Sequence, residues 1–452
     1  MIKKTDESTE TVPAAPSLSA DDGSFLIPNA PKSFLAQDLD KILMHAWRIG
    51  ASDTTIQTYE PIMYEVHGRL RKGSHHRLSP TEIQLLVSAA YGSEAGIARM
   101  SGGADLDFAY EITLSRADQA AEKTTDSRIR FRVNATAIAV GAHTGFQITL
   151  RLISGKPPAV ETLGVEPEIL DAFFPKQGLV LVTGATGSGK STLLAACIRK
   201  MCEDPESHRK ILTYESPIEF VYDDVDKPAT IVSQTEIGKH LPSFAAGVRN
   251  ALRRKPMVIL IGEARDAETI GECVTASMTG HLTYSTVHSN GVADTIRRMV
   301  NAFPPEEQNS RLFDIVASLK LIVSQMLVRT PDGKRCALRE YLVFDRKVTD
   351  LLLEGGAAAL TTNSRLAMNL YGRSFLQDAD AKLAEGRIDR DTFKAIRRLS
   401  EAHDRDAGMP AEHGRCHPAR PPSLPNTTPR SAPILLQGQK RNSSLPIQRW
   451  KK

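Results

Sequence analysis

A glycine-rich loop between an apolar run and a helical run constrains this chain more than any other segment. Residues 178–183 read Gly-Leu-Val-Leu-Val-Thr, residues 184–191 read Gly-Ala-Thr-Gly-Ser-Gly-Lys-Ser, and a helix-forming run follows over residues 192–200. A short, apolar, β-branched run bounded by glycine predicts a buried parallel strand. Strand, glycine loop and helix stand in the order that a phosphate-binding loop requires. The segment therefore predicts a nucleotide-binding α/β domain.

The residue types of this loop suit a nucleoside triphosphate. Glycines allow backbone N–H groups to turn inward around the β- and γ-phosphates, at the positive end of a helix dipole. Lys190 would reach the phosphate oxygens, and Ser191 would place its hydroxyl on Mg²⁺. The predicted binding residues for ATP are Gly184, Ala185, Thr186, Gly187, Ser188, Gly189, Lys190, Ser191 and Thr192.

Three further segments of the same region carry acids or histidines next to predicted strands. A carboxylate at the carboxyl end of a parallel strand lies where open α/β sheets bind ligands, and it can hold Mg²⁺ or orient an attacking water. Taken singly, each acid is read more simply as a solvated strand end, and each histidine as a structural residue. The segments are residues 210–220 with Glu215 and Glu219, residues 256–266 with Glu263, and residues 279–290 with His281 and His288.

Composition divides the 452 residues into four predicted parts. Residues 1–32 form a loose leader and residues 406–452 a disordered basic tail. Between them, an α+β domain spans residues 33–154 and a nucleotide domain with C-terminal helices spans residues 155–405. Within the α+β domain we expect a helix over 35–48, strands over 62–67, 106–112, 129–134 and 146–153, and a hairpin insertion over 115–127.

Charge is concentrated in the tail. From residue 407 onward, eight Lys and Arg residues stand against one acid, a net charge of +7, whereas the whole chain carries +4 and the remainder about −3. Eight prolines and few core-forming residues predict disorder there. The tail is either a basic arm for nucleic acid or acidic lipid or, more simply, a solvated extension.

Other sequence features limit the class of protein. Five scattered cysteines without ligand spacing indicate neither a disulfide framework nor a zinc site, and they fit a reducing cytoplasm. The first thirty residues lack the basic and apolar regions of a signal peptide. No run of eighteen apolar residues predicts a membrane span. We therefore expect any membrane association to go through a partner or the protein surface.

Together these segments resemble the secretion ATPase family of type II and type IV machines. The phosphate loop corresponds to Walker A, residues 212–219 to the Asp box, residues 259–266 to Walker B and residues 279–290 to the His box. Arg-Phe-Arg-Val-Asn at 130–134 and Gly-Val-Glu-Pro-Glu at 164–168 also look like the PilT retraction ATPases. Tyr-Glu-Ser-Pro at 214–217 and Arg-Lys-Pro-Met at 254–257 look most like the DotB and TraJ ATPases of type IVB secretion and plasmid conjugation. The tetracysteine zinc insert usual in assembly ATPases has no counterpart in the sequence.

The resemblance implies a RecA-like P-loop ATPase domain joined to a smaller, PAS-like α+β domain, in a homohexameric ring with ATP between the two domains. Ser216 replaces the usual Asp-box aspartate, which leaves the contribution of that position open. The roles implied for the other residues are phosphate binding for Lys190, Mg²⁺ binding for Ser191, general base for Glu219, support of Mg²⁺ and water for Glu263, coupling of nucleotide state to domain movement for His281 and His288, and positive charge at the γ-phosphate for Arg132 and Arg151.

The function that this resemblance implies is a cytoplasmic, ATP-hydrolysing motor, peripheral at the inner membrane. It would work with inner-membrane and cytoplasmic components of a type IVB secretion or conjugative transfer apparatus. A type IV pilus retraction motor for twitching motility is the alternative, since it shares every catalytic motif. The near-neutral charge outside the tail counts against a nucleic-acid translocase, although contact with nucleic acid stays open. Lys190, Glu219 and Glu263 count against a catalytically inactive scaffold.

Overall fold

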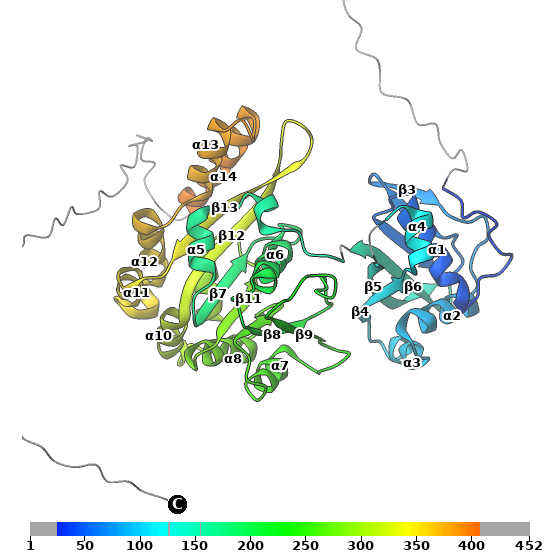
Figure 1. The fold of residues 1–452 in the computed structure, drawn as a ribbon, viewed down its shortest axis with the longest axis horizontal. Helices are drawn as coiled ribbons and strands as arrows, with labels where there is room; N and C mark the ends of the chain where they lie inside the picture. The colour runs from blue at the N-terminus through cyan, green and yellow to red at the C-terminus, as the bar shows by residue number, and fades with distance from the viewer. Residues whose placement is uncertain (1–24, 125–126, 154, 407–452) are drawn as a thin grey trace, which may run out of the picture. The chain divides into compact units, whose positions relative to one another are not determined.

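The computed structural model describes residues 25–124, 127–153 and 155–406. The described elements form two sheets with helices against them (Figure 1). The basic tail and all but the last residues of the predicted leader lie outside the described residues, so the expectations for them stay predictions. Among the described helices, none combines the length and the apolar character that crossing a membrane requires.

The first sheet has six strands in the order β3-β2-β1-β6-β5-β4, all paired antiparallel. Alternate residues such as Ile56, Val133 and Leu150 are fully buried in its core, which explains the period-two pattern of the sequence. The strands are β1 (Asp53–Gln57), β2 (Met63–Val66), β3 (Arg69–Lys72), β4 (Leu106–Thr113), β5 (Arg128–Val140) and β6 (His143–Ile153).

Helices pack on this sheet and also replace one predicted hairpin. The predicted helix over 35–48 is found as η1 (Ala36–Asp38) and α1 (Leu39–Arg48), followed later by α2 (Pro80–Tyr91) and α3 (Ala95–Ser101). The hairpin predicted over residues 115–127 is wrong, because helix α4 (Arg116–Glu122) lies there. A capping box starts that helix: the Ser115 hydroxyl accepts from the Asp118 N–H, and the Asp118 carboxylate accepts from the Ser115 N–H.

The second sheet has seven strands in the order β13-β12-β7-β11-β10-β8-β9. All neighbours pair in parallel except β12 and β13, which form an antiparallel edge. All six residues of β7 are buried, as expected for a central parallel strand covered on both faces. The strands are β7 (Gly178–Thr183), β8 (Lys210–Glu215), β9 (Ile231–Glu236), β10 (Val258–Ile261), β11 (Leu282–Val287), β12 (Leu319–Arg329) and β13 (Arg335–Val343).

Helices cover both faces of this sheet (Figure 1). Side chains of α5 and α6 pack in one apolar cluster with alternate residues of β7, β10 and β11. The remaining residues of these strands face a second cluster that draws on α7 to α12. The helices are η2 (Val160–Leu163), α5 (Pro167–Phe173), α6 (Lys190–Glu203), α7 (Phe244–Ala251), α8 (Ala267–Met278), α9 (Val292–Asn301), α10 (Gln308–Ser318), α11 (Arg346–Leu353) and α12 (Gly356–Tyr371).

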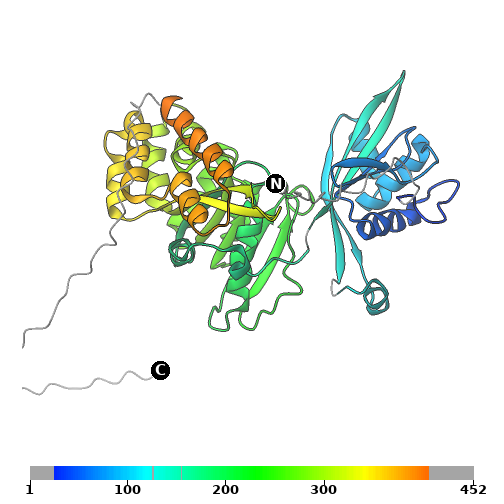
Figure 2. The same cartoon turned by 90° about the horizontal axis from the view of Figure 1, so that it is seen from above.

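The last described helices, α13 (Phe375–Ala384) and α14 (Arg390–Asp406), follow the antiparallel edge of the sheet. Cys336 and Leu338 of β13 share a buried cluster with Ala379 of α13 and Ile396 of α14. Figure 2 shows these helices in orange beside the yellow edge strands. The packing joins the C-terminal helices to the antiparallel edge strands β12 and β13.

Candidate active site

The glycine loop joins the carboxyl end of β7 to the first turn of α6, in the predicted order. Gly184, Gly187 and Gly189 have φ values of +139°, +77° and +85°, which L side chains rarely adopt. Gly184 also lies too close to β12 for any side chain, since a Cβ there would come within 2.3 Å of the Gln325 carbonyl oxygen. Both backbone conformation and packing therefore require glycine in the loop.

Lys190 lies almost buried at the start of α6. Its ammonium donates to the carbonyl oxygens of Gly184 and Ala185, at 2.9 Å each. Burial lowers the pKa of Lys190, while the nearby charges of Glu263 and Glu219 oppose that shift. The ammonium group thus contacts its own loop and lies within electrostatic range of Glu263 and Glu219, two of the acids predicted from the sequence.

The loop residues fit a phosphate group. The Ser188 hydroxyl is buried and, among the described residues, has no hydrogen-bond partner. Ser191 and Thr192 lie in the first turn of α6, where unpaired N–H groups and the helix dipole favour an anion. These donors, together with Lys190, match the chemistry of a triphosphate with its Mg²⁺.

Glu263 follows the carboxyl end of β10, two strands from β7. One of its carboxylate oxygens lies 2.6 Å from Nε of Arg265, and the other lies 3.5 Å from Nε2 of His288. Within the described residues, no cluster of three His, Cys, Asp or Glu side chains could hold a metal by itself. Mg²⁺ typically takes one or two protein ligands and completes its shell with phosphate oxygens and water, which Ser191 and Glu263 would allow.

The Asp-box acids lie at the end of β8 and in the turn that follows. The Glu215 carboxylate accepts from the Thr213 hydroxyl at 2.6 Å and from the Gln234 amide at 3.2 Å. Burial of the carboxyl group raises the pKa of Glu215 to about 7, with a further contribution from the charge of Glu219. Glu219 is also an electrostatic neighbour of Lys190. Two carboxylates therefore share this edge, and only Glu219 lies close enough to the loop cation to affect its pKa.

Arg130 belongs to the Arg-Phe-Arg-Val-Asn segment but is not among the predicted site residues. It is 3% exposed, and its guanidinium donates to the carbonyl oxygens of Ile218 and Glu219 at 2.8 and 2.9 Å. The sequence feature that could have identified Arg130 is the alternation along β5. Phe131 and Val133 are buried in the core, so Arg130 and Arg132 lie on the other face of the strand. Arg130 therefore holds the backbone of the segment that carries Glu219.

The two arginines named from the sequence pair with acids of their own sheet. Arg132 donates to Asp107 at 2.7 Å, and Arg151 to Asp53 at 2.8 Å. The pairing with Asp107 raises the pKa of Arg132, and the charge of Glu219 adds to that effect. The structure therefore brings Arg132 into electrostatic range of a site acid, whereas Arg151 pairs with β1.

The two histidines lie at opposite ends of β11. His288 follows the carboxyl end and faces Glu263, and burial together with the charge of Lys190 lowers the pKa of His288. His281 precedes the amino end, where its Nδ1 lies 3.1 Å from the carbonyl oxygen of Ala276. Six strand residues separate them, about 20 Å at the usual rise per residue. The structure brings His288 into the site and leaves His281 at the other edge of the sheet.

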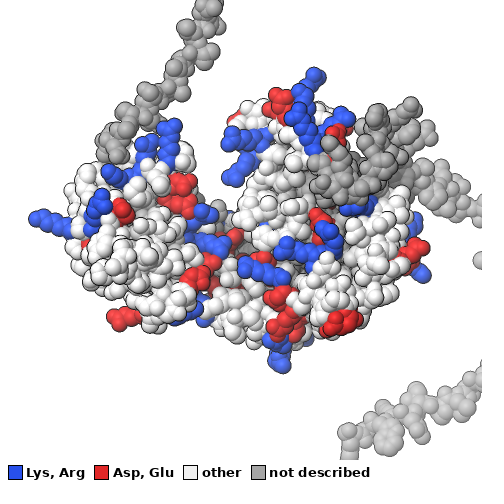
Figure 3. Space-filling model, turned by 180° about the vertical axis from the view of Figure 1, so that it is seen from behind, with Lys and Arg blue, Asp and Glu red and all other residues white. Residues whose placement is uncertain are grey.

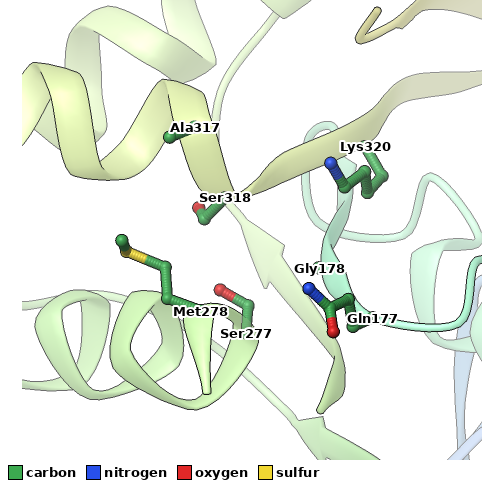
Figure 4. A pocket seen from close by; sticks show the side chains of 7 residues that line it. All are labelled: Gln177, Gly178, Ser277, Met278, Ala317, Ser318 and Lys320. Atoms are coloured by element: carbon green, nitrogen blue, oxygen red, sulfur yellow. The ribbon is translucent and has the colours of Figure 1, made fainter. Parts of the chain in front are cut away.

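A cavity of about 200 Å³ lies at that other edge (Figure 4). Gln177 and Gly178 at the start of β7 line it, together with residues at the ends of α8 and α10. The phosphate loop follows the opposite end of β7, so this cavity is separate from the nucleotide site.

The charged side chains of the surface are mixed in sign. Figure 3 shows Lys and Arg interspersed with Asp and Glu over the face in view, without one continuous basic field.

Comparison with known proteins identifies the family. Residues 29–387 match the family described as "Type II/IV secretion system protein". The match covers most of the chain, and the phosphate loop and both acidic strand ends lie within it. The chain belongs to this family.

Individual relatives match nearly along their full length. The type IV pilus retraction ATPase PilT of Pseudomonas aeruginosa is 30% identical over 364 residues, which are 80% of this chain and 99% of PilT. The crystal structure of the Legionella pneumophila ATPase DotB is 46% identical with a TM-score of 0.75, over 82% of this chain and 98% of DotB. The pilus retraction motor PilT with bound ADP is 29% identical with a TM-score of 0.65, over 78% of this chain and 95% of that chain.

These matches confirm the predicted fold class, a mixed α/β protein with two sheets like DotB and PilT. Membership of a family of secretion and pilus ATPases indicates nucleotide binding and ATPase activity. The family assignment made from the motifs is therefore confirmed. The domain boundaries, the hexameric ring and the individual residue roles stay predictions.

Proposed function

We propose that this protein is the ATP-hydrolysing motor of a type IVB secretion or conjugative plasmid transfer apparatus. The observation that carries the proposal is the 46% identity to the ATPase DotB across almost its whole length, combined with a complete phosphate loop and acids at the expected strand ends. The reaction is hydrolysis of ATP to ADP and phosphate, with the free energy used for mechanical work on machine partners.

In this proposal the chain's residues divide the chemistry between them. Gly184 to Thr192 bind the phosphates, and Ser191 and Glu263 hold Mg²⁺, which neutralises phosphate charge when bound. Glu219 accepts the proton of the attacking water, while Arg130 fixes its backbone. Arg132 and Arg151 supply positive charge toward the γ-phosphate. His288, in contact with Glu263, and His281, at the other end of β11, link nucleotide state to domain movement.

The proposal includes a setting for the motor. The protein works in the cytoplasm as a homohexamer, held at the inner membrane by components of the apparatus. Sedimentation of the purified protein with ATP and Mg²⁺ should give the mass of six chains. Recovery of monomers alone at all concentrations would contradict the ring.

A type IV pilus retraction ATPase is the second candidate, because the PilT relative matches 80% of the chain. Deletion of the gene in its own host separates the two functions. We expect loss of protein secretion or plasmid transfer with unchanged twitching, restored by the wild-type gene and not by a Lys190→Ala copy. Loss of twitching with normal transfer would instead favour pilus retraction.

A further inference from the structure

A chain of buried polar side chains, joined by hydrogen bonds, runs from the phosphate loop to the C-terminal helix α13. It starts at Gln325 of β12, whose side-chain amide donates to the carbonyl oxygen of Ser188 in the loop at 2.7 Å. The same side chain lies against Gly189, where an added Cβ would come within 2.8 Å of the Gln325 amide nitrogen. Gln325 therefore contacts the loop at two of its residues.

The next member of the chain is Arg339, which faces Gln325 directly in the β12–β13 pairing. Its Nε donates to the Gln325 side-chain oxygen at 2.8 Å, so one amide group joins the loop to the guanidinium. Arg339 is 1% exposed. A charge at this depth needs fixed partners, and its remaining donors find them in Glu166 and in the carbonyl oxygens of Leu163 and Gly164.

Helix α13 closes the chain. The Asp378 carboxylate, fully buried, accepts from the backbone N–H of Arg339 at 2.9 Å. Lys382, one turn later on α13, lies 2.7 Å from both Asp378 and Glu166. Glu166 thus accepts from Arg339 and from Lys382, and nearby positive charges help to lower the pKa of its carboxyl group against the effect of burial. Each ion in this cluster is paired, so a shift of one member displaces the others.

We propose that Gln325 and Arg339 are positioning residues that set the conformation of the phosphate loop and transmit its nucleotide state to α13. The proposal rests on the proposed binding of nucleotide at the loop. When a phosphate binds to the N–H donors of residues 184–192, the hydrogen bond from the Gln325 amide limits how far the Ser188 carbonyl oxygen can move. Any movement of that amide changes the Arg339 contact, and through Glu166 and Asp378 it reaches Lys382.

Gln325→Glu tests the connection at one atom. The substitution keeps an oxygen acceptor for Arg339, and the fold with it, but it places a carboxylate against the Ser188 carbonyl in place of an N–H donor. Gln325→Met, which removes both contacts, serves as the second variant. Arg373→Met is the matched control, because Arg373 also donates to Asp378, at 3.1 Å, but within the described part of the chain it makes no hydrogen bond to Gln325 or the loop.

Two readouts on the full-length protein are needed. Fluorescent ADP with Mg²⁺ should bind Gln325→Glu about 10-fold more weakly than wild type, and Arg373→Met within about 2-fold. Hydrogen exchange of residues 375–384 should change when saturating ADP is added to the wild type or to Arg373→Met, and should not change in Gln325→Glu. A role confined to folding would not remove this nucleotide response.

The outcomes separate this inference from the proposed function. A wild-type protein that fails to bind ADP would overturn nucleotide binding itself. Normal ADP affinity in Gln325→Glu, or an α13 response equal to that of wild type, would overturn the relay while leaving the proposed function standing. A wild-type α13 that does not respond to bound ADP would do the same.

Discussion

At the carboxyl end of the parallel sheet, Lys190, Glu263 and His288 lie together, whereas the amino end carries His281 and a cavity between α8 and α10. The two ends belong to the same strands, and both carry a histidine and a lysine. They differ because the glycine loop at the carboxyl end of β7 leads into the N-terminus of α6, and N–H donors are supplied there. Residue type alone therefore does not identify the nucleotide site. The end of the strand at which a residue lies determines whether it belongs to that site.

The largest expected effect comes from the lysine at the carboxyl end. Lys190→Ala should lower ATP turnover by about 10³-fold and weaken nucleotide binding, because it removes the cation that meets the phosphates. Lys320→Ala, at the cavity of the amino end, is the matched control and should keep turnover within about 2-fold. Phosphate release from purified protein measures both. Equal losses in the two variants would erase the difference between the ends.

Glu219→Gln should lower kcat by about 10²-fold while leaving ADP affinity near the wild-type value, since it removes a proton acceptor and keeps the side-chain shape. The contacts of Arg130 go to backbone carbonyl oxygens, so the segment should hold its position in the variant. Glu203→Gln, on the exposed side of α6, controls for the loss of one charge. Turnover near normal in Glu219→Gln would assign the base to another group, with Glu215 as the next candidate.

Sequence reasoning reached the parts of the fold that local pattern controls. Three features depend only on consecutive residues, and the structure has all three: the apolar run of β7, the glycine loop and the alternation in β5. The hairpin predicted over 115–127 is wrong, because a helix lies there. Its capping box can be recognised in the sequence, since Ser115 and Asp118 stand three residues apart before a run of helix formers.

The contacts between distant segments could not be predicted from local pattern. Gln325, Arg339 and Asp378 are each separated by many residues from Ser188, and only the register of β12 with β13 and the packing of α13 bring them together. The separation of His281 from His288 depends on strand pairing in the same way. The sequence predicts a strand in the segment that carries the two histidines, and the parallel pairing of that strand with β7 places His288 at the loop end and His281 at the other.

The two histidines offer the sharpest test of the comparison between the ends. His288→Ala should lower turnover by about 10-fold, because His288 contacts Glu263, the proposed ligand of Mg²⁺. His281→Ala should change turnover by no more than about 2-fold in the purified protein, because its contacts are with the backbone of α8. Steady-state ATPase assays across a Mg²⁺ series measure both. A larger loss in His281→Ala would show that the amino end takes part in hydrolysis.

The smallest expected effect is on the pH dependence of stability, and it concerns Glu215. Its pKa is about 7 in the folded protein against an ordinary value of 4.5, so the folded state holds a proton that the unfolded chain releases between these values. Stability from this group is therefore present below about pH 4.5 and is lost as pH rises toward 7. Glu215→Gln cannot titrate, and its amide oxygen can still accept from Thr213 and Gln234.

We therefore expect the melting temperature of Glu215→Gln, relative to wild type, to rise by about 3 °C between pH 5 and pH 8. All other titrating groups, His288 included, are shared by the two proteins and cancel in the difference. Melting curves at half-unit steps of pH, recorded without nucleotide, give the comparison. Parallel curves would mean that Glu215 ionises at its ordinary pKa in the folded protein. A widening gap would show that the folded protein keeps Glu215 protonated to a higher pH than the unfolded chain does.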